Sequence, residues 1–282
     1  MIDTSGLLSW GAATDRGLRR AANEDSFIAQ PPIFLVADGM GGHDAGADAS
    51  RAAVTGFESL VGLETVTVTQ VEDAFQAAVA GVGSIVSDRN AAGTTLAGVI
   101  VTESAGAPYW LVLNIGDSRV YRLTEGELEQ ISTDHSAVQA MVDRGEIDSR
   151  DAEQHPQRNV VTRAVGAGSS GLPDYWLLPA ARDDRIMICS DGLTKELADA
   201  EIRRVLLDEP AAQAAATRLV HEALVRGGRD NVTVVVVDAH QVLLDDDDPT
   251  VPGVDAGTGN GVDEDTVPRF LVAEEGRRDA DI

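Results

Sequence analysis

Four aspartates lie where apolar, strand-like runs meet glycine, serine or asparagine. Asp38 ends the run IFLVAD, Asp117 ends LVLNIGD, Asp191 ends RIMICSD, and Asp230 precedes NVTVVVV. A carboxylate at the end of a hydrophobic strand lies at the rim of the core, where solvent is thin and like charges repel strongly. Any one of these aspartates alone would be read as an ordinary turn residue, whose side chain caps its own backbone. Four of them in one chain predict a shared metal site, because cations would offset their repulsion.

A polar cluster precedes the first of these aspartates. The segment RGLRRAANEDSF contains Arg20, Asn23, Glu24 and Asp25. Taken alone it is a polar loop. Beside a metal site it gains meaning, because arginine binds phosphate with a planar fork and the two acids can hold metal-bound waters. Oxygen ligands select hard cations such as Mg²⁺ or Mn²⁺ over zinc. The cluster therefore predicts a phosphate ester as the substrate.

The elements that must position these residues are strands and helices in alternating groups. Short connections between the early strand-like runs favour antiparallel pairing, and TEG at residues 124–126 predicts a hairpin turn. Helices grouped between runs of antiparallel strands indicate an α+β layered domain. We expect strands at residues 7–15, 26–30, 33–38, 94–102, 109–117, 119–126, 127–132, 160–166, 185–191 and 231–239, and helices at residues 44–60, 71–90, 135–147, 198–208 and 211–227.

Composition excludes several functional classes. The chain has 282 residues, of which 43% are hydrophobic, enough for a substantial core. Its formal net charge of −25 opposes binding to nucleic acid or to anionic membranes. No run approaches the roughly 20 apolar residues of a membrane helix, and the first residues lack a signal-peptide pattern, so we expect a cytoplasmic protein. The single cysteine, Cys189, lies in an apolar run and is expected to be buried rather than nucleophilic.

The pattern of apolar residues stops after about residue 240. We therefore assign residues 1–240 to one domain and residues 241–282 to an acidic tail, which combines like charge with Gly and Pro and is expected to be disordered. The tripeptide TVP occurs twice in it, at Thr250 and Thr266, each time after an acidic run. These threonines fit either a plain linker or a docking site, for example for a phosphothreonine-binding partner.

The whole set of motifs resembles one enzyme family. The strings RxxNED, ADGMGGH, AGTTL, IGDSRVY, DHS, SDGL and GGRDNVTV occur in the order found in bacterial metal-dependent protein serine/threonine phosphatases of type 2C, the PPM family. The resemblance covers about residues 7–240. It implies a four-layer α-β-β-α sandwich, in which two antiparallel sheets are flanked by helices, and a flap at about residues 135–166 beside the metal site.

The resemblance also assigns metal ligands. Asp38 would bridge two Mn²⁺ or Mg²⁺ ions, and the carbonyl of Gly39 would join one of them. Asp191 and Asp230 would complete the coordination of the other ion. Asp117, together with Asp191, would hold a third and looser ion.

Four further residues complete the implied site. Glu24 and Asp25 would act through metal-bound waters, and Arg20 would hold the substrate phosphate. Eukaryotic members carry a histidine directly after the Asp-Gly pair, where this chain has Met40. The nearest histidine is His43, which we keep as a candidate proton donor, with metal-bound water as the alternative.

The implied function is hydrolysis of phosphoserine and phosphothreonine in proteins by a hydroxide that the metals activate, opposing a bacterial Ser/Thr kinase. The expected partners are phosphorylated proteins and the kinases that modify them. One alternative is a pseudophosphatase, a phosphoprotein-binding signalling module, but that would require the loss of a metal ligand and none is lost. Another is a Ca²⁺-binding module, which would need closely spaced acids in one loop, whereas these are scattered along the chain.

Overall fold

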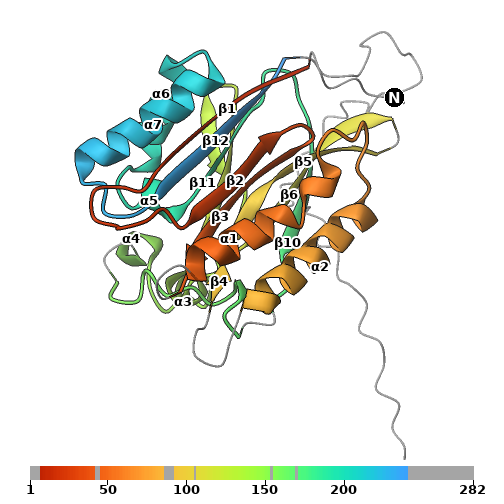
Figure 1. Ribbon diagram of the computed structural model, residues 1–282. Coiled ribbons are helices and arrows are strands. Elements are labelled where there is room, and N and C mark those ends of the chain that lie inside the picture. The colour runs from red at the N-terminus through yellow and green to blue at the C-terminus, as the bar shows by residue number, and fades with distance from the viewer. Residues whose placement is uncertain are drawn as a thin grey trace, which may run out of the picture.

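Two antiparallel sheets pack face to face, and helices cover the outer face of each (Figure 1). The computed structural model describes residues 7–41, 45–85, 92–104, 106–152, 155–168 and 171–240. The predicted tail at residues 241–282 lies outside the described residues. The predicted α+β four-layer sandwich is confirmed.

The first sheet has five strands, and helices α6 and α7 lie across its outer face (Figure 1). In spatial order the strands are β1 (Leu8–Asp15), β12 (Val232–Ala239), β11 (Arg185–Cys189), β7 (Arg119–Thr124) and β8 (Glu127–Gln130); the helices are α6 (Asp199–Asp208) and α7 (Ala212–Arg226). Glu125 and Gly126 join β7 to β8 with φ angles of 51° and 81°. Positive φ at both central residues is the geometry that matches strand twist in a tight hairpin, so the predicted turn is confirmed.

The second sheet has seven strands, and helices α1 and α2 cover it (Figure 1). Its path is β10 (Asp174–Pro179), β6 (Ala107–Ile115), β5 (Leu96–Ser104), β3 (Ile33–Met40), β4 (Gly93–Thr94) and β9 (Val165–Gly166), while β2 (Asp25–Gln30) also pairs with β3; the helical elements are α1 (Ala45–Thr55), a 3₁₀ turn (Glu58–Leu60) and α2 (Val68–Ile85).

Alternate residues of the central strands face opposite layers of the core. In β3, Ile33 and Leu35 pack under α1 and α2, whereas Phe34 and Val36 pack between the sheets. In β12, Val235 and Val237 fill the same space between the sheets. Because such strands are buried on both faces, their sequences are continuous apolar runs rather than alternating ones.

The segment between β8 and β9 leaves the sheets and carries two short helices, α3 (Ala137–Asp143) and α4 (Ser149–Ala152), which lie below the sheets in Figure 1. The Ser136 side chain caps α3 by accepting a hydrogen bond from the Gln139 N–H. The predicted strand at residues 160–166 is wrong in extent: Val161 forms an isolated bridge to Ser136, and only Val165–Gly166 pairs as a strand.

Strand β10 was not predicted. Proline lies directly before it, at Pro173, and at its last residue, Pro179, and these turn-forming residues hide its alternation. Its position explains the prolines, because β10 is an edge strand with only β6 as a neighbour. Within the part of the chain that the structure describes, no helix is long and apolar enough to cross a membrane.

Candidate metal centre

The ends of several strands bring the predicted aspartates into electrostatic contact. Asp38 lies near the end of β3, and Asp117 lies in the turn between β6 and β7. Asp191 opens the short helix α5 (Asp191–Thr194) directly after β11, and Asp230 comes just before β12. Because β11 and β12 pair in antiparallel fashion, the end of one meets the start of the other. The four aspartates are therefore gathered from positions almost 200 residues apart in sequence.

Asp25 joins this group from the neighbouring strand. It lies opposite Asp38 in the β2–β3 pair, and its Oδ2 accepts hydrogen bonds from Ser190 Oγ at 2.8 Å and Thr233 Oγ1 at 2.7 Å. Burial raises the pKa of Asp25 to about 7; the two hydroxyls oppose this shift, and the negative charge of Asp191 adds to it. The carboxylate is thus held in one orientation inside a strongly negative site. No role was predicted for Ser190 or Thr233, although both lie within three residues of a predicted aspartate.

Three other carboxyls of the site also resist ionisation. Burial raises the pKa of Asp38 well above its ordinary value, and the charges of Asp25, Asp191 and Asp117 raise it further. Burial and the charge of Asp191 raise the pKa of Asp117 to about 7. The pKa of Asp191 is raised by burial, against the opposing effect of Lys195. Such mutual repulsion at a water-poor rim is what a bound cation would relieve.

Asp230 is different because two cations contact it. Arg20 Nε lies 2.7 Å from its Oδ1, and Lys195 Nζ lies 3.0 Å from its Oδ2. Burial by itself would raise the pKa of Asp230, but Lys195 and Arg20 together lower it. Lys195 Nζ also lies 2.5 Å from Asp191 Oδ2, so one ammonium joins both carboxylates. Arg20 thus lies beside Asp230 with half of its side chain exposed to solvent, and its predicted contact with phosphate stays a prediction.

The residues fit a hard divalent cation in charge and in donor type. Asp25 Oδ1 and Asp191 Oδ1 are buried and have no hydrogen-bond partner within the described structure. Buried, unpaired carboxylate oxygens are costly unless a ligand completes them. All the predicted donors are oxygen atoms, which suits Mg²⁺ or Mn²⁺. The set of ligands is not complete, however: among the described residues, no three His, Cys, Asp or Glu side chains are arranged to hold a metal ion.

The backbone around Gly39 is packed too closely for any side chain. The Gly39 N–H donates to the Glu24 carbonyl at 3.1 Å, and a Cβ on Gly39 would lie 2.2 Å from the Gly46 carbonyl oxygen in α1. Only glycine lets α1 approach β3 this closely. The same packing keeps Glu24 next to the predicted ligand Gly39.

Asn231 holds the loop that carries Arg20 and Glu24. Its Oδ1 accepts from the Glu24 N–H at 2.9 Å, and its Nδ2 donates to the carbonyls of Arg16 and Ala22, both at 2.9 Å. This role was not predicted from the sequence. The signal was the position of Asn231 directly after Asp230, since a residue at the start of β12 must face the loop that follows β1.

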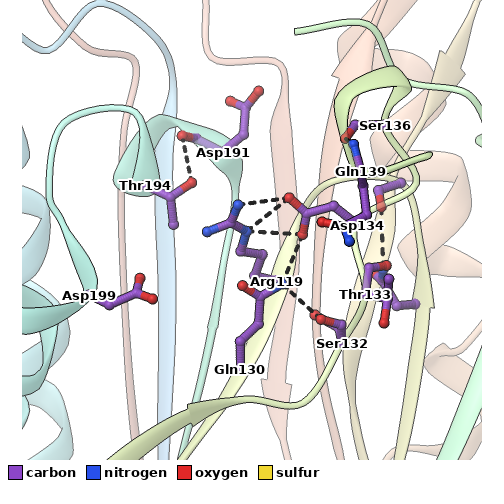
Figure 2. Close-up of polar contacts among 12 residues, drawn as sticks. Arg119, Gln130, Ser132, Thr133, Asp134, Ser136, Gln139, Asp191, Thr194 and Asp199 are labelled. Atoms are coloured by element: carbon purple, nitrogen blue, oxygen red, sulfur yellow. Dashed lines mark hydrogen bonds and ion pairs between the residues drawn. The ribbon is translucent and has the colours of Figure 1, made fainter. Parts of the chain in front are cut away.

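A cavity of about 910 Å³ opens beside the carboxylates and is lined by Asp117, Asp191, Asp230 and Lys195, among others. Val138 and Gln139 of α3 and Arg158 lie on its other wall, so the segment predicted as a flap borders the candidate centre. In Figure 2, the Arg119 guanidinium turns toward Asp134 and forms bonds of 2.8 to 3.1 Å with it. Asp134 therefore holds the Arg119 side chain in the wall of the cavity.

Two histidines and the single cysteine remain to be placed. His43 falls in residues 42–44, outside the described residues, and its predicted role as proton donor stays a prediction. Cys189 is fully buried, and burial raises the pKa of its thiol to about 12, which agrees with an inert residue. His135 accepts a hydrogen bond from the Gly116 N–H at 3.1 Å through Nδ1, and its Nε2 lies 2.9 Å from Asp174 Oδ2. It holds the turn that carries Asp117.

Comparison with known proteins agrees with the geometry. A family model described as "Protein phosphatase 2C" matches residues 19–226. The serine/threonine protein phosphatase PstP of Mycobacterium tuberculosis is 38% identical over 274 residues, which are 91% of this chain and 52% of that protein. The chain thus spans about half the length of this relative. The serine/threonine phosphatase stp of Listeria innocua is 34% identical over 80% of this chain and 93% of that protein.

A solved structure shares the fold. The crystal structure of the catalytic domain of PstP, in complex with two manganese ions, superposes with a TM-score of 0.73 at 35% identity. The match covers 83% of this chain and 99% of that chain.

Proposed function

Because this chain belongs to the protein phosphatase 2C family, we propose that it is a metal-dependent phosphatase that hydrolyses phosphoserine and phosphothreonine in proteins. The observation that carries the proposal is the convergence of five aspartates, two of which have a buried oxygen without a hydrogen-bond partner among the described residues. Related proteins are named as serine/threonine phosphatases, and one of them has been crystallised with two manganese ions. The counterpart in the cell would be a Ser/Thr kinase.

We assign to the residues the roles that the family resemblance implies. Asp38, the Gly39 carbonyl, Asp191 and Asp230 would hold two Mn²⁺ or Mg²⁺ ions, and Asp117 with Asp191 would hold a third. When bound, the cations lower the pKa of a water molecule and neutralise charge on the phosphoryl oxygens. Ser190 and Thr233 keep the Asp25 carboxylate oriented toward the site.

Arg20 would bind the phosphate. Its guanidinium lies at the exposed edge of the site, already held by Asp230, so it is oriented before substrate arrives. The cavity beside α3 and Arg158 is large enough to admit a peptide segment around the phosphorylated side chain.

The direct test is hydrolysis of a phosphothreonine peptide by the purified chain with Mn²⁺ or Mg²⁺, followed as release of inorganic phosphate between pH 6 and 9. We expect turnover that needs the metal and stops with EDTA. A folded protein that binds Mn²⁺ but releases no phosphate from peptides or from p-nitrophenyl phosphate would instead support the alternative of a phosphoprotein-binding pseudophosphatase.

Replacement of Arg20 by alanine should reduce kcat/KM for the phosphopeptide by about 100-fold, mainly through a higher KM, because a bidentate contact with phosphate is lost. Arg20→Lys should recover only part of this, since an ammonium lacks the planar fork. The matched control is Arg19→Ala, which removes the same charge from the neighbouring, exposed position. Equal effects of the two alanine variants would show that Arg20 acts only through general charge.

A further inference from the structure

Lys195 is the only lysine in the chain; the other 21 of its 22 basic residues are arginines. It follows α5 directly, and its N–H donates to the Asp191 carbonyl at 2.9 Å, which fixes its backbone one helical turn after that aspartate. Its side chain is 31% exposed and lines the cavity. The sequence analysis assigned no function to this residue.

The ammonium of Lys195 lies between two predicted metal ligands. Nζ is 2.5 Å from Asp191 Oδ2 and 3.0 Å from Asp230 Oδ2. Both contacts are ion pairs at direct-contact distance, and the one to Asp230 is also a hydrogen bond. A metal ion coordinated by the same two oxygens would need this space, and two cations so close together would repel strongly.

The ammonium completes the site only in part. It contacts one oxygen of Asp191, while Oδ1 of the same carboxylate stays buried without a hydrogen-bond partner. Among the described residues, no three His, Cys, Asp or Glu side chains are arranged to hold a metal ion. Asp191 and Asp230 nevertheless both contact the one ammonium. Lys195 therefore places a single positive charge between two of the predicted metal ligands.

We propose that Lys195 is an internal competitor for the metal ion held by Asp191 and Asp230. In the metal-free protein its ammonium holds these two carboxylates together, and an incoming Mn²⁺ or Mg²⁺ must displace it into the cavity. Lys195 thereby stabilises the metal-free protein and weakens the metal affinity of this position. This role rests on the metal site of the proposed function. It adds a residue that sets the metal concentration at which the site fills.

Because the chain has one lysine, the wild-type protein can report the displacement directly. An amine-directed acetylating reagent, applied to the intact chain, can modify only Lys195 and the α-amino group. We expect slow acetylation of Lys195 without metal, and a rate at least tenfold higher with saturating Mn²⁺, quantified by mass spectrometry of the peptide that contains it. The α-amino group, labelled in the same samples, is the internal control. A Lys195 rate that does not change while Mn²⁺ binds would overturn the proposal.

Substitution tests the effect on affinity. Lys195→Met removes the charge and leaves an unbranched side chain of similar length, so Mn²⁺ should bind the metal-free variant about tenfold more tightly in calorimetric titration, and the melting temperature without metal should fall. Lys195→Arg keeps the charge and should stay close to wild type in both measurements. The control is Arg204→Met, which removes an ion-paired cation on α6 that contacts Asp208 and Glu222; its Mn²⁺ affinity should not change.

The outcomes separate this proposal from the proposed function. If wild type and Lys195→Met bind Mn²⁺ equally well, the competitor role is wrong and the metal-dependent phosphatase stands. If Lys195→Met binds Mn²⁺ more weakly, Lys195 supports the metal instead of competing with it, and the proposal is again wrong. If neither binds Mn²⁺, both the metal site and the competitor role are rejected. Should Lys195→Met fail to fold without metal, the acetylation rates of the wild type still decide the question.

Discussion

Replacement of Asp38 by asparagine is expected to lower kcat/KM for a phosphothreonine peptide by about 1,000-fold or more while the protein stays folded. Asparagine keeps the shape of the side chain but removes the charge of the proposed bridge between two metal ions, so the affinity for Mn²⁺ should also fall. The backbone of Asp38 is held independently, since its N–H donates to Thr95 Oγ1 at 2.9 Å and its carbonyl accepts from the Thr95 N–H at 2.9 Å. The measurements are steady-state kinetics and calorimetric titration with Mn²⁺.

The same variant should be at least as stable as the wild type without metal. Burial and three neighbouring carboxylates raise the pKa of Asp38, so its ionised form destabilises the metal-free fold near neutral pH, and asparagine removes that cost. Asp73→Asn on the exposed side of α2 is the matched control and should change neither activity nor metal affinity. Activity within tenfold of wild type would refute the bridging role.

Without metal, the free energy of unfolding is expected to fall as the pH rises towards neutral. The ordinary pKa of an aspartate is 3.8, and in the folded chain it is raised to about 7 for both Asp25 and Asp117. Between these values the folded protein binds protons that the unfolded chain does not, so the free energy of unfolding falls as the pH rises from about 4 to 7. The slope is on the order of 1 kcal/mol per pH unit for each such group.

Asp230 does not cancel this trend. Its pKa is lowered, so the stability that it contributes is present above its ordinary pKa and is lost only as the pH falls below that value. Thermal or urea unfolding of the EDTA-treated protein at pH 5.5 and pH 8 measures the effect. We expect the metal-free protein to be more stable at pH 5.5.

Addition of Mn²⁺ should raise the melting temperature more at pH 8 than at pH 5.5, since protons compete with the metal for the carboxylates. Mg²⁺ and Mn²⁺ can be compared in the same experiment. A metal-free protein that becomes more stable from pH 5.5 to pH 8 would contradict the assignment of these aspartates to one mutually repelling cluster.

The sequence by itself determined the fold class and the identity of the main acidic residues. Strands such as β3 and β12 are continuous apolar runs because both of their faces are buried, and the aspartates at their ends mark the rim of the core. The order of the motifs then identified the family. Edge elements were harder to predict: β10 is preceded by one proline and ends at another, and the segment at residues 160–166 forms a strand only where it meets β4. Such segments take their structure from one neighbouring strand rather than from their own pattern.

Only the tertiary structure decided which side chains meet at the carboxylates. Asp25 is held by Ser190, which directly follows β11, and by Thr233 in β12, both from the other sheet, and Asn231 holds the loop that carries Glu24. Lys195 could be singled out in the sequence as the one lysine, but its contact with both Asp191 and Asp230 depends on the turn of α5 against the start of β12. Local sequence patterns set the strands and their ends, whereas contacts between residues far apart in the chain follow from how the two sheets pack, and no local pattern encodes that packing.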